Sequence, residues 1–441
     1  MPTTPAPPRA SLLLLAYLAF VSLGLPDGLL GVGWPSISAD FGVPTEAVGL
    51  LLTAGTVGYL TSSVLAGFTL ARVGVGALLA GSTLLASLAL TGYAASPGLV
   101  VLVGCALLLG LGSGAIDSGL NAYAAGAFGP RHMNWMHAFF GLGVAIGPLI
   151  MTAALSAGLA WRWGYGIVAA AQLALATAFA LTVRAWRRRD PAESGAAVAT
   201  SPAPPAAQVS IRATLRLPAV WSGALAFALY VAIEVSAGLW AFLLLTEGRG
   251  LSAAVAGGCV SAYWGSLFVG RVVQGVVAER LGARLVLRGS LAGMAFGAVL
   301  IAVPGSAAVA VLGLVVVGFA AAPVFPLLTL TTADRVGAAH ADRAIGLQIG
   351  AAGVGAALVP AGLGVLIGTT SVQALGPALV VLALALVVLY ELGARRPGPE
   401  RPLPAEAGPD QPTSPVPAGT GQAGTAAQPV SGPVLPVVDG R

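Results

Sequence analysis

Lysine is absent from this sequence, and charged residues of every kind make up only 8% of its 441 positions. Soluble domains carry about 25% charged residues, so this chain has too few charges to keep a globular surface in water. The scarcity argues against a soluble enzyme and a nucleic-acid-binding protein, although 21 arginines against 16 acids give a net charge of +5. The rest is largely apolar, since 57% of the residues are hydrophobic and another 61 are glycine. This composition is typical of a chain embedded in lipid.

Cysteine and histidine are almost missing too. Cys105 and Cys259 both stand in apolar runs, which favours small buried side chains over a disulfide or a metal site. His132, His137 and His340 lack metal-ligand spacing, and no soluble catalytic domain accompanies them. We therefore expect no enzyme activity, no metal and no cofactor. A channel is not favoured either, because no filter-like loop repeats.

Long apolar runs are abundant. A helix needs about 20 mostly apolar residues to cross about 30 Å of hydrocarbon. The runs do not alternate polar and apolar residues as barrel strands would, so helices are predicted. The first run continues through Pro26 and Asp27 to Trp34, unlike a cleavable signal peptide. Twelve spans are predicted, near residues 11–37, 46–70, 75–95, 98–126, 135–157, 163–184, 218–246, 252–278, 283–303, 305–332, 343–367 and 370–393.

Arginine placement predicts the sidedness of these helices, because Arg and Lys concentrate in cytoplasmic loops. Only Arg162 and Arg249 fall in the odd-numbered connections. The even-numbered connections carry Arg72, Arg131, Arg184, Arg187, Arg188, Arg189, Arg212, Arg216, Arg280, Arg284, Arg288, Arg335 and Arg343. Both termini are thus predicted to lie inside, in a multi-pass protein of the cytoplasmic (inner) membrane.

The pattern divides the chain into five segments. The last of them is rich in Pro, Gly, Ala and Thr without an apolar period, so it is expected to be disordered. The segments are an inner tail (1–10), a six-helix bundle (11–184), a cytoplasmic linker (185–217), a second six-helix bundle (218–393) and a cytoplasmic tail (394–441).

The two halves resemble each other at an offset of 208 residues, which becomes 212 after the loop around Arg335. Six crossings separate equivalent positions, so the repeat is parallel, about an axis along the membrane normal. The sequence therefore predicts an all-α membrane protein with twelve transmembrane helices in two pseudo-symmetric six-helix bundles. Gly42, Gly67, Arg72, Gly74, Gly110, Gly141, Gly143 and Pro148 correspond to Gly250, Gly275, Arg280, Gly282, Gly318, Gly353, Gly355 and Pro360.

The short loop after the eighth span carries a recognisable pattern. Gly275-Val-Val-Ala-Glu279-Arg280-Leu-Gly282-Ala-Arg284 resembles the signature of the major facilitator superfamily, with Glu279 where Asp is usual. The resemblance implies the major facilitator fold and transport by alternating access. It also implies that this loop takes part in gating.

The equivalent loop of the first half is a degraded copy. It reads Gly67-Phe-Thr-Leu-Ala71-Arg72-Val-Gly74, with Ala71 at the acidic position. Arg72, Glu279 and Arg280 are therefore gating candidates, although the first half lacks the acid of an inner latch.

A second pattern narrows the resemblance. Gly112-Ser-Gly-Ala-Ile-Asp117-Ser-Gly-Leu-Asn121, followed by Asn134-Trp-Met-His137-Ala-Phe-Phe-Gly141, is similar to the fucose-permease-type branch of proton and sugar symporters. In that branch the fourth helix carries an acid four residues before an Asn. The first-helix acid of that branch does not align with Asp27, which lies about one turn earlier.

Acids inside the apolar spans are the main functional candidates. Burying an ionised group there costs at least about 2.5 kcal/mol, so each must be paired, protonated or in contact with water. Asp117, Glu234 and Asp27 are the predicted proton-coupling residues, since a carboxyl group in a partly wetted apolar site can bind and release protons near neutral pH. Simple hydrogen bonding between helices is the alternative role for each. Arg271, the one base embedded deep within a span, is expected to pair with an acid near the gate or to extend to the interface.

Substrate-binding candidates lie near these acids. Asn121 lies on the same helix face as Asp117. His137 is predicted near the inner end of the fifth span, at about the same depth as Asn121, so the two could approach each other. Aromatic rings offer stacking surfaces for a sugar, although interfacial belts explain many such residues as well. The predicted substrate-binding residues are Asn121, His137, Trp34, Tyr230, Tyr263, Trp264 and Gln348.

Two functions fit these residues. The first is a monomeric secondary transporter that moves a small polar solute, a sugar or sugar-like compound, together with protons. The alternative is a proton-driven exporter of amphipathic drugs or metabolites. The expected partners are the small-molecule substrate, protons and membrane lipid, and no nucleic acid.

Overall fold

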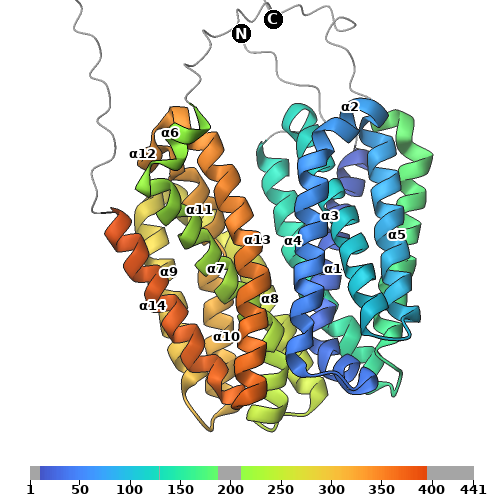
Figure 1. Cartoon of the computed structure of the whole chain (residues 1–441), viewed down its shortest axis with the longest axis vertical. Coiled ribbons are helices and arrows are strands. Elements are labelled where there is room, and N and C mark those ends of the chain that lie inside the picture. Colours follow the sequence, from blue (N-terminus) through green and yellow to red (C-terminus); the bar gives the residue numbers. More distant parts are fainter. Residues whose placement is uncertain (1–9, 129, 187–209, 395–441) are drawn as a thin grey trace, which may run out of the picture. The chain divides into compact units, whose positions relative to one another are not determined.

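A computed structural model describes residues 10–128, 130–186 and 210–394 (Figure 1). They belong to one compact unit, Met1–Pro399. Every regular element in the described residues is helical, and eleven helices are long and apolar enough to cross a membrane. Most of the predicted linker and nearly all of both predicted tails lie outside the described residues, so those parts of the domain division stay predictions.

The first repeat contains the blue-to-green helices of Figure 1. Its elements are α1 (Ala10–Phe41), η1 (Thr45–Ala47), α2 (Val48–Ala95), α3 (Leu99–Ala127), α4 (Pro130–Ser156), α5 (Arg162–Thr182) and η2 (Val183–Trp186). α1 packs mainly on α4 and α5, and α2 packs on α3 and α5.

The second repeat begins after a short helix within the predicted linker, α6 (Ile211–Leu215). Its elements are α7 (Pro218–Leu243), η4 (Leu244–Gly248), α8 (Ala253–Leu281), α9 (Ala283–Ala302), α10 (Ala307–Ala321), α11 (Val324–Leu330), α12 (Thr332–Val336), α13 (Ala338–Thr369), η5 (Val372–Ala374) and α14 (Leu375–Ala394). The predicted tenth span, 305–332, is interrupted before Val324, so α10 and α11 share one crossing.

Two equivalent glycines separate neighbouring spans. α2 has 48 residues, which at about 1.5 Å per residue is too long for one crossing. Gly74 breaks it with φ 77° and ψ 165°, and Gly282 adopts nearly the same conformation, φ 83° and ψ 144°, between α8 and α9. A side chain rarely adopts positive φ, so glycine is needed at both turns. Counting α2 as two crossings gives the predicted twelve within the described residues.

Packing inside each repeat follows the same equivalence. A Cβ atom on Gly110 of α3 would collide with the Gly55 carbonyl of α2. In the second repeat, a Cβ on Gly318 of α10 would collide with the Tyr263 carbonyl of α8. Both pairs are related by the offset of 208, so the predicted pseudo-symmetry extends to individual backbone contacts. Small residues let membrane helices approach this closely.

The two bundles meet through two equivalent helix pairs, α4 with α8 and α2 with α13. Gly141 of α4 lies against Phe268, and its equivalent Gly353 of α13 lies against Leu60. The α4–α8 pair also carries hydrogen bonds across the boundary, such as Ser261 Oγ to the Ala145 carbonyl at 2.6 Å.

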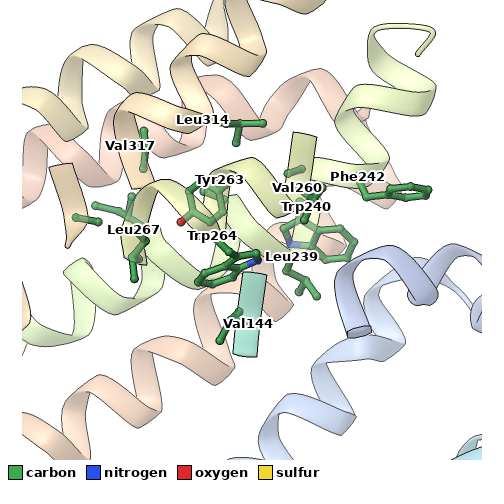
Figure 2. Close-up of a cluster of buried hydrophobic side chains, with 14 of the residues drawn as sticks. Val144, Leu239, Trp240, Phe242, Val260, Tyr263, Trp264, Leu267, Leu314 and Val317 are labelled. Atoms are coloured by element: carbon green, nitrogen blue, oxygen red, sulfur yellow. The ribbon is translucent and has the colours of Figure 1, made fainter. Parts of the chain in front are cut away.

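We call the end of the helices at which α1 and α7 finish the outer end, following the arginine distribution. There Gly31 of α1 sits within van der Waals range of the backbone of Gly238 and Leu239 on α7. Buried side chains from both bundles continue this contact in one core cluster, where Val144 of α4 lies beside Trp264 of α8 (Figure 2). α1 and α7 are therefore in contact at the outer end, so the two bundles meet there.

The two arginines of the predicted outer loops each tie three outer segments together. Arg162 pairs with Asp40 at 2.5 Å and donates to the Ser96 carbonyl. Arg249 donates to the side chain of Gln373 and to the Ile301 and Val303 carbonyls. In each repeat the end of the first helix is thereby joined to the two other outer loops.

Candidate functional site

Asp117 is held on α3 by two hydrogen-bond donors. The hydroxyl of Tyr59 donates to Oδ2 at 2.6 Å, and Nδ2 of Asn121 donates to Oδ1 at 2.9 Å. The second bond runs along one helix face, as the spacing of four residues predicts. Asn121 therefore supports Asp117, and the structure gives no hydrogen bond between Asn121 and His137 among the described residues.

Tyr59 is a site residue that the sequence analysis missed. It reaches Asp117 because α2 and α3 are in close contact, with Gly114 against the Tyr59 carbonyl and Gly110 against its amide nitrogen. The only signal in the sequence was a single hydroxyl-bearing aromatic residue in a small-residue span. Which neighbour it faces depends on helix pairing that the spacing of residues does not specify.

His137 lies where the two bundles meet. Its side chain is exposed and its ring packs edge-on against Phe20 at a centroid distance of 5.2 Å. The charges of Asp117 and Arg271 both act on the imidazole. Nη1 of Arg271, on α8, donates to the His137 carbonyl at 3.2 Å. The arginine thus crosses from the second bundle to the first.

Glu234 forms the matching centre in the second bundle. Its carboxylate accepts a hydrogen bond from Tyr230, one turn earlier on α7, as the spacing predicts. Its backbone carbonyl accepts a hydrogen bond from the hydroxyl of Tyr263 at 2.7 Å. The charge of Arg271 also acts on Glu234. Asp117, His137, Arg271 and Glu234 thus form a chain across the bundle boundary in which one link, from Arg271 to the His137 carbonyl, is a hydrogen bond, and the other two are longer-range electrostatic influences.

Asp27 stands apart from that chain. It is exposed, although the residues one turn before it and both adjacent residues are buried, and α1 is packed by helices on several sides. Its charge acts on three neighbouring tyrosines, Tyr59, Tyr93 and Tyr165. Among the described residues Asp27 has no hydrogen-bond or ion-pair partner.

The backbone beside Asp27 is interrupted. Pro26 has no amide hydrogen, so the Ser22 carbonyl one turn earlier lacks its helical donor. Nε2 of Gln172 on α5 approaches that carbonyl at 3.4 Å. A side-chain amide thus replaces the missing backbone donor, because an unpaired carbonyl in apolar surroundings is costly.

Other predicted binding residues are occupied elsewhere. The indole of Trp34 is buried at the outer end and donates to the Thr45 carbonyl at 2.8 Å. Trp264 is packed against Gly238 and stands next to Tyr263 (Figure 2). Gln348 is buried and accepts from Thr332 at 3.0 Å. In this conformation these three side chains serve packing or hydrogen bonding within the protein.

The predicted gating residues Arg72, Glu279 and Arg280 are all exposed near the inner loops. Within the described residues the ion pairs are Asp40–Arg162 and Arg288–Glu391, and neither includes a gating candidate. Arg271 is the gating candidate that makes a contact between bundles.

Comparison with protein families gives a clear result. The family model described as Major Facilitator Superfamily matches residues 16–360 and 236–433. Among curated proteins, none matches the chain.

Solved structures with the same fold have low sequence identity. A mutant of the nucleoside transporter NupG superposes with a TM-score of 0.70 at 14% identity, covering 87% of this chain and 100% of its own. The nucleoside transporter NupG itself gives a TM-score of 0.63 at 15% identity, with the same coverage of 87% and 100%. A bacterial homolog of the human lysosomal transporter Spinster, in an inward-facing and occupied conformation, gives 0.68 at 13% identity, covering 89% and 98%. At such identities the likeness establishes the fold alone.

Proposed function

The chain belongs to the Major Facilitator Superfamily of membrane transporters, and from this premise we propose that it moves a small polar solute, a sugar or sugar-like compound, together with protons by alternating access. We place it in the cytoplasmic membrane as a monomer with both termini inside. The proposal rests chiefly on one observation, the hydrogen bond from Arg271 to the His137 carbonyl, which crosses the boundary between the bundles within electrostatic reach of Asp117 and Glu234.

Asp117 is the proposed proton carrier. As a carboxylate it accepts from Tyr59 and Asn121, and its charge acts on His137. Protonation removes that charge, so the attraction between Asp117 and the groups at the bundle boundary is lost. The electrostatic field at the Arg271–His137 contact then changes. Proton binding at Asp117 can thereby alter how the two bundles are held together.

Glu234 is the proposed second coupling residue. Arg271 interacts with it from α8 while contacting α4, so the arginine is shared between an acid of its own bundle and the backbone of the other. A rocking motion that separates α4 from α8 must break the latter contact. Parallel repeats of this fold rock around a site at their interface.

A neutral polyhydroxyl solute fits the groups around this site. Asn121, His137 and the hydroxyls of Tyr59 and Tyr230 supply donors and acceptors close to the two acids. Because neighbours of the same fold include a nucleoside transporter, nucleosides belong among the candidate solutes. The alternative is proton-driven export of amphipathic compounds, and Asp27 favours it. Its carboxylate is exposed and has no partner among the described residues, which would suit a cationic solute.

Purified protein in liposomes separates the two functions. Uptake of a neutral sugar or nucleoside that makes the external medium more alkaline supports symport. Proton antiport with hydrophobic cations supports export, and transport that ignores the proton gradient contradicts both. Thermal-shift measurements with sugars, nucleosides, amino acids and cationic drugs select the solutes for this assay.

A further inference from the structure

The outer end holds a cavity that is separate from the charged chain described above. Its volume is about 390 Å³, toward the lower end of the range of about 300 to 1,000 Å³ typical of small-molecule sites. The walls come from the end of α1, from the turn that follows it and from the end of α7. The lining residues are Trp34, Pro35, Ser38, Ala39, Gly42, Val43, Thr45, Leu243 and Glu247.

Glu247 is the only charged residue that lines this cavity. Its side chain is exposed, and among the described residues it has no hydrogen-bond or ion-pair partner. The two arginines of the outer loops are engaged elsewhere, since Arg249 donates to Gln373 and two carbonyls while Arg162 pairs with Asp40. The cavity therefore combines the apolar side chains of Trp34, Pro35 and Val43 with the hydroxyl-bearing residues Ser38 and Thr45 and one carboxylate that has no ion-pair partner among the described residues.

The backbone that carries Glu247 is unusual. α7 does not end as an α-helix but continues as one π-helical turn, η4, over Leu244–Gly248. π-helical turns are rare and occur frequently at functional sites. This turn brings Glu247 to the cavity wall one turn beyond Leu243, opposite the α1 residues.

We propose that this cavity is a second ligand site, which binds a small organic cation with an apolar body, its ammonium group on Glu247 and its apolar part against the α1 wall. Because α1 belongs to the first bundle and α7 to the second, such a ligand bridges the two. It therefore stabilises the conformation in which the outer ends are together, and slows exchange of solute across the membrane. The site goes beyond the proposed function, since its binding can be measured whatever the transported solute is.

Benzylamine is a suitable probe, with benzyl alcohol as its neutral counterpart. We expect purified protein to bind benzylamine more tightly than benzyl alcohol, by isothermal titration. Glu247→Gln should weaken benzylamine binding roughly tenfold, which is the usual effect of losing a charge-assisted hydrogen bond, and leave benzyl alcohol unchanged. Equal binding of both probes, or unchanged benzylamine binding by Glu247→Gln, would overturn the proposal.

Two matched variants locate the binding. Glu46→Gln removes an acid from η1 at the same end that does not line the cavity, so it should bind benzylamine as the unaltered protein does. Asp27→Asn should also retain binding, and loss of binding in that variant would assign the cation to the central region instead. Tryptophan fluorescence gives an independent signal, because Trp34 lies in the wall and Trp34→Phe should remove the change on binding.

Counterflow exchange tests whether ligand binding in this cavity slows the conformational change that carries solute across the membrane. Saturating benzylamine should slow exchange of whichever solute the protein carries by at least threefold, and Glu247→Gln should abolish that inhibition. An exchange rate that benzylamine leaves unchanged would contradict the bridging role. Failure of the sugar and proton proposal would leave the titration results standing, so the two proposals can fail separately.

Discussion

Position 117 of the first repeat is an aspartate that accepts hydrogen bonds from Tyr59 and Asn121, whereas the equivalent position of the second repeat is Phe325. The Phe325 ring packs edge-on against Phe227 and beside Tyr230 at centroid distances of 5.2 and 6.4 Å. Gly110 and Gly318, seven residues earlier in each repeat, both bring the neighbouring helix close, although α3 continues through Asp117 whereas the second repeat is interrupted before Val324. Duplication has kept the packing and changed the polar chemistry.

For the first helix of each repeat, it is the second repeat, not the first, that carries the hydrogen-bonded acid. On α7, Glu234 is partnered by Tyr230 and acted on by Arg271, while on α1 Asp27 is exposed and, among the described residues, unpartnered. Of the three acids deep within the spans, Asp117 in the first repeat and Glu234 in the second are thus the hydrogen-bonded ones, and they lie on different helices. If the proposed function holds, the two halves contribute unequally to coupling.

The largest expected effect concerns Asp117. Asp117→Asn keeps the size of the side chain but removes the titratable group, so proton-driven accumulation should fall at least about a hundredfold, while counterflow exchange continues. Transport in proteoliposomes with and without a pH gradient measures both. Phe325→Leu at the equivalent position should leave coupling intact, and proton-driven transport that survives Asp117→Asn would remove Asp117 from the mechanism.

The next effect concerns the packing that the repeats share. Gly110→Val and Gly318→Val each place side-chain atoms where a carbonyl of the neighbouring helix lies, so both should destabilise the protein by about 1 to 3 kcal/mol or more. Thermal unfolding in detergent measures the loss. Gly104→Val is the matched control on α3, since nothing lies within 4 Å of a Cβ there. Destabilisation by only one of the two variants would break the equivalence of the repeats.

Hydroxyl removal sharpens the comparison of the two acids. Tyr59→Phe takes away one of the two donors to Asp117, a loss of about 1 kcal/mol or roughly a fivefold lower rate of proton-coupled transport. Tyr230→Phe should have a smaller effect, because Arg271 still acts on Glu234. Initial uptake rates in liposomes test the order, and a larger effect at Tyr230 would reverse the proposed roles.

The smallest effect concerns the interrupted backbone of α1. Gln172→Leu leaves the Ser22 carbonyl without its side-chain donor, so the free energy of unfolding should fall by about 0.5 to 1 kcal/mol. α7 has no such proline, so no equivalent polar contact is needed there. Thr177→Ala, on the exposed face of the same helix, is the control and should leave the melting temperature unchanged.

The sequence was sufficient for the helices and the repeat because both depend on local features. Run length specifies a crossing, and Gly74 and Gly282 mark turns that need positive φ. The predicted spans therefore agree with the structure, apart from the interruption before Val324, where a proline ends α10 within one crossing. Pro323 marked this break in the sequence, but the length of the apolar run alone predicted one uninterrupted span.

Contacts along one helix were predictable, and contacts between helices were not. The Asp117–Asn121 and Tyr230–Glu234 pairs follow from a spacing of four residues. The Tyr59–Asp117 bond depends on helix pairing, so spacing alone could not give it. The same limit applies to Trp34, a predicted substrate-binding residue whose indole instead donates to the turn after α1.

The contacts made by Arg162 and Arg249 at the outer end differ in how strongly dissolved salt affects them. Asp40 and Arg162 are both charged and partly exposed, whereas Arg249 ends on an amide and two carbonyls. Dissolved ions weaken an exposed ion pair, worth about 0 to 1 kcal/mol, far more than a bond to a neutral group. Salt therefore weakens the Asp40–Arg162 contact of the first repeat more than the Arg249 contacts of the second, so ionic strength alone changes the relative stability of the two outer ends.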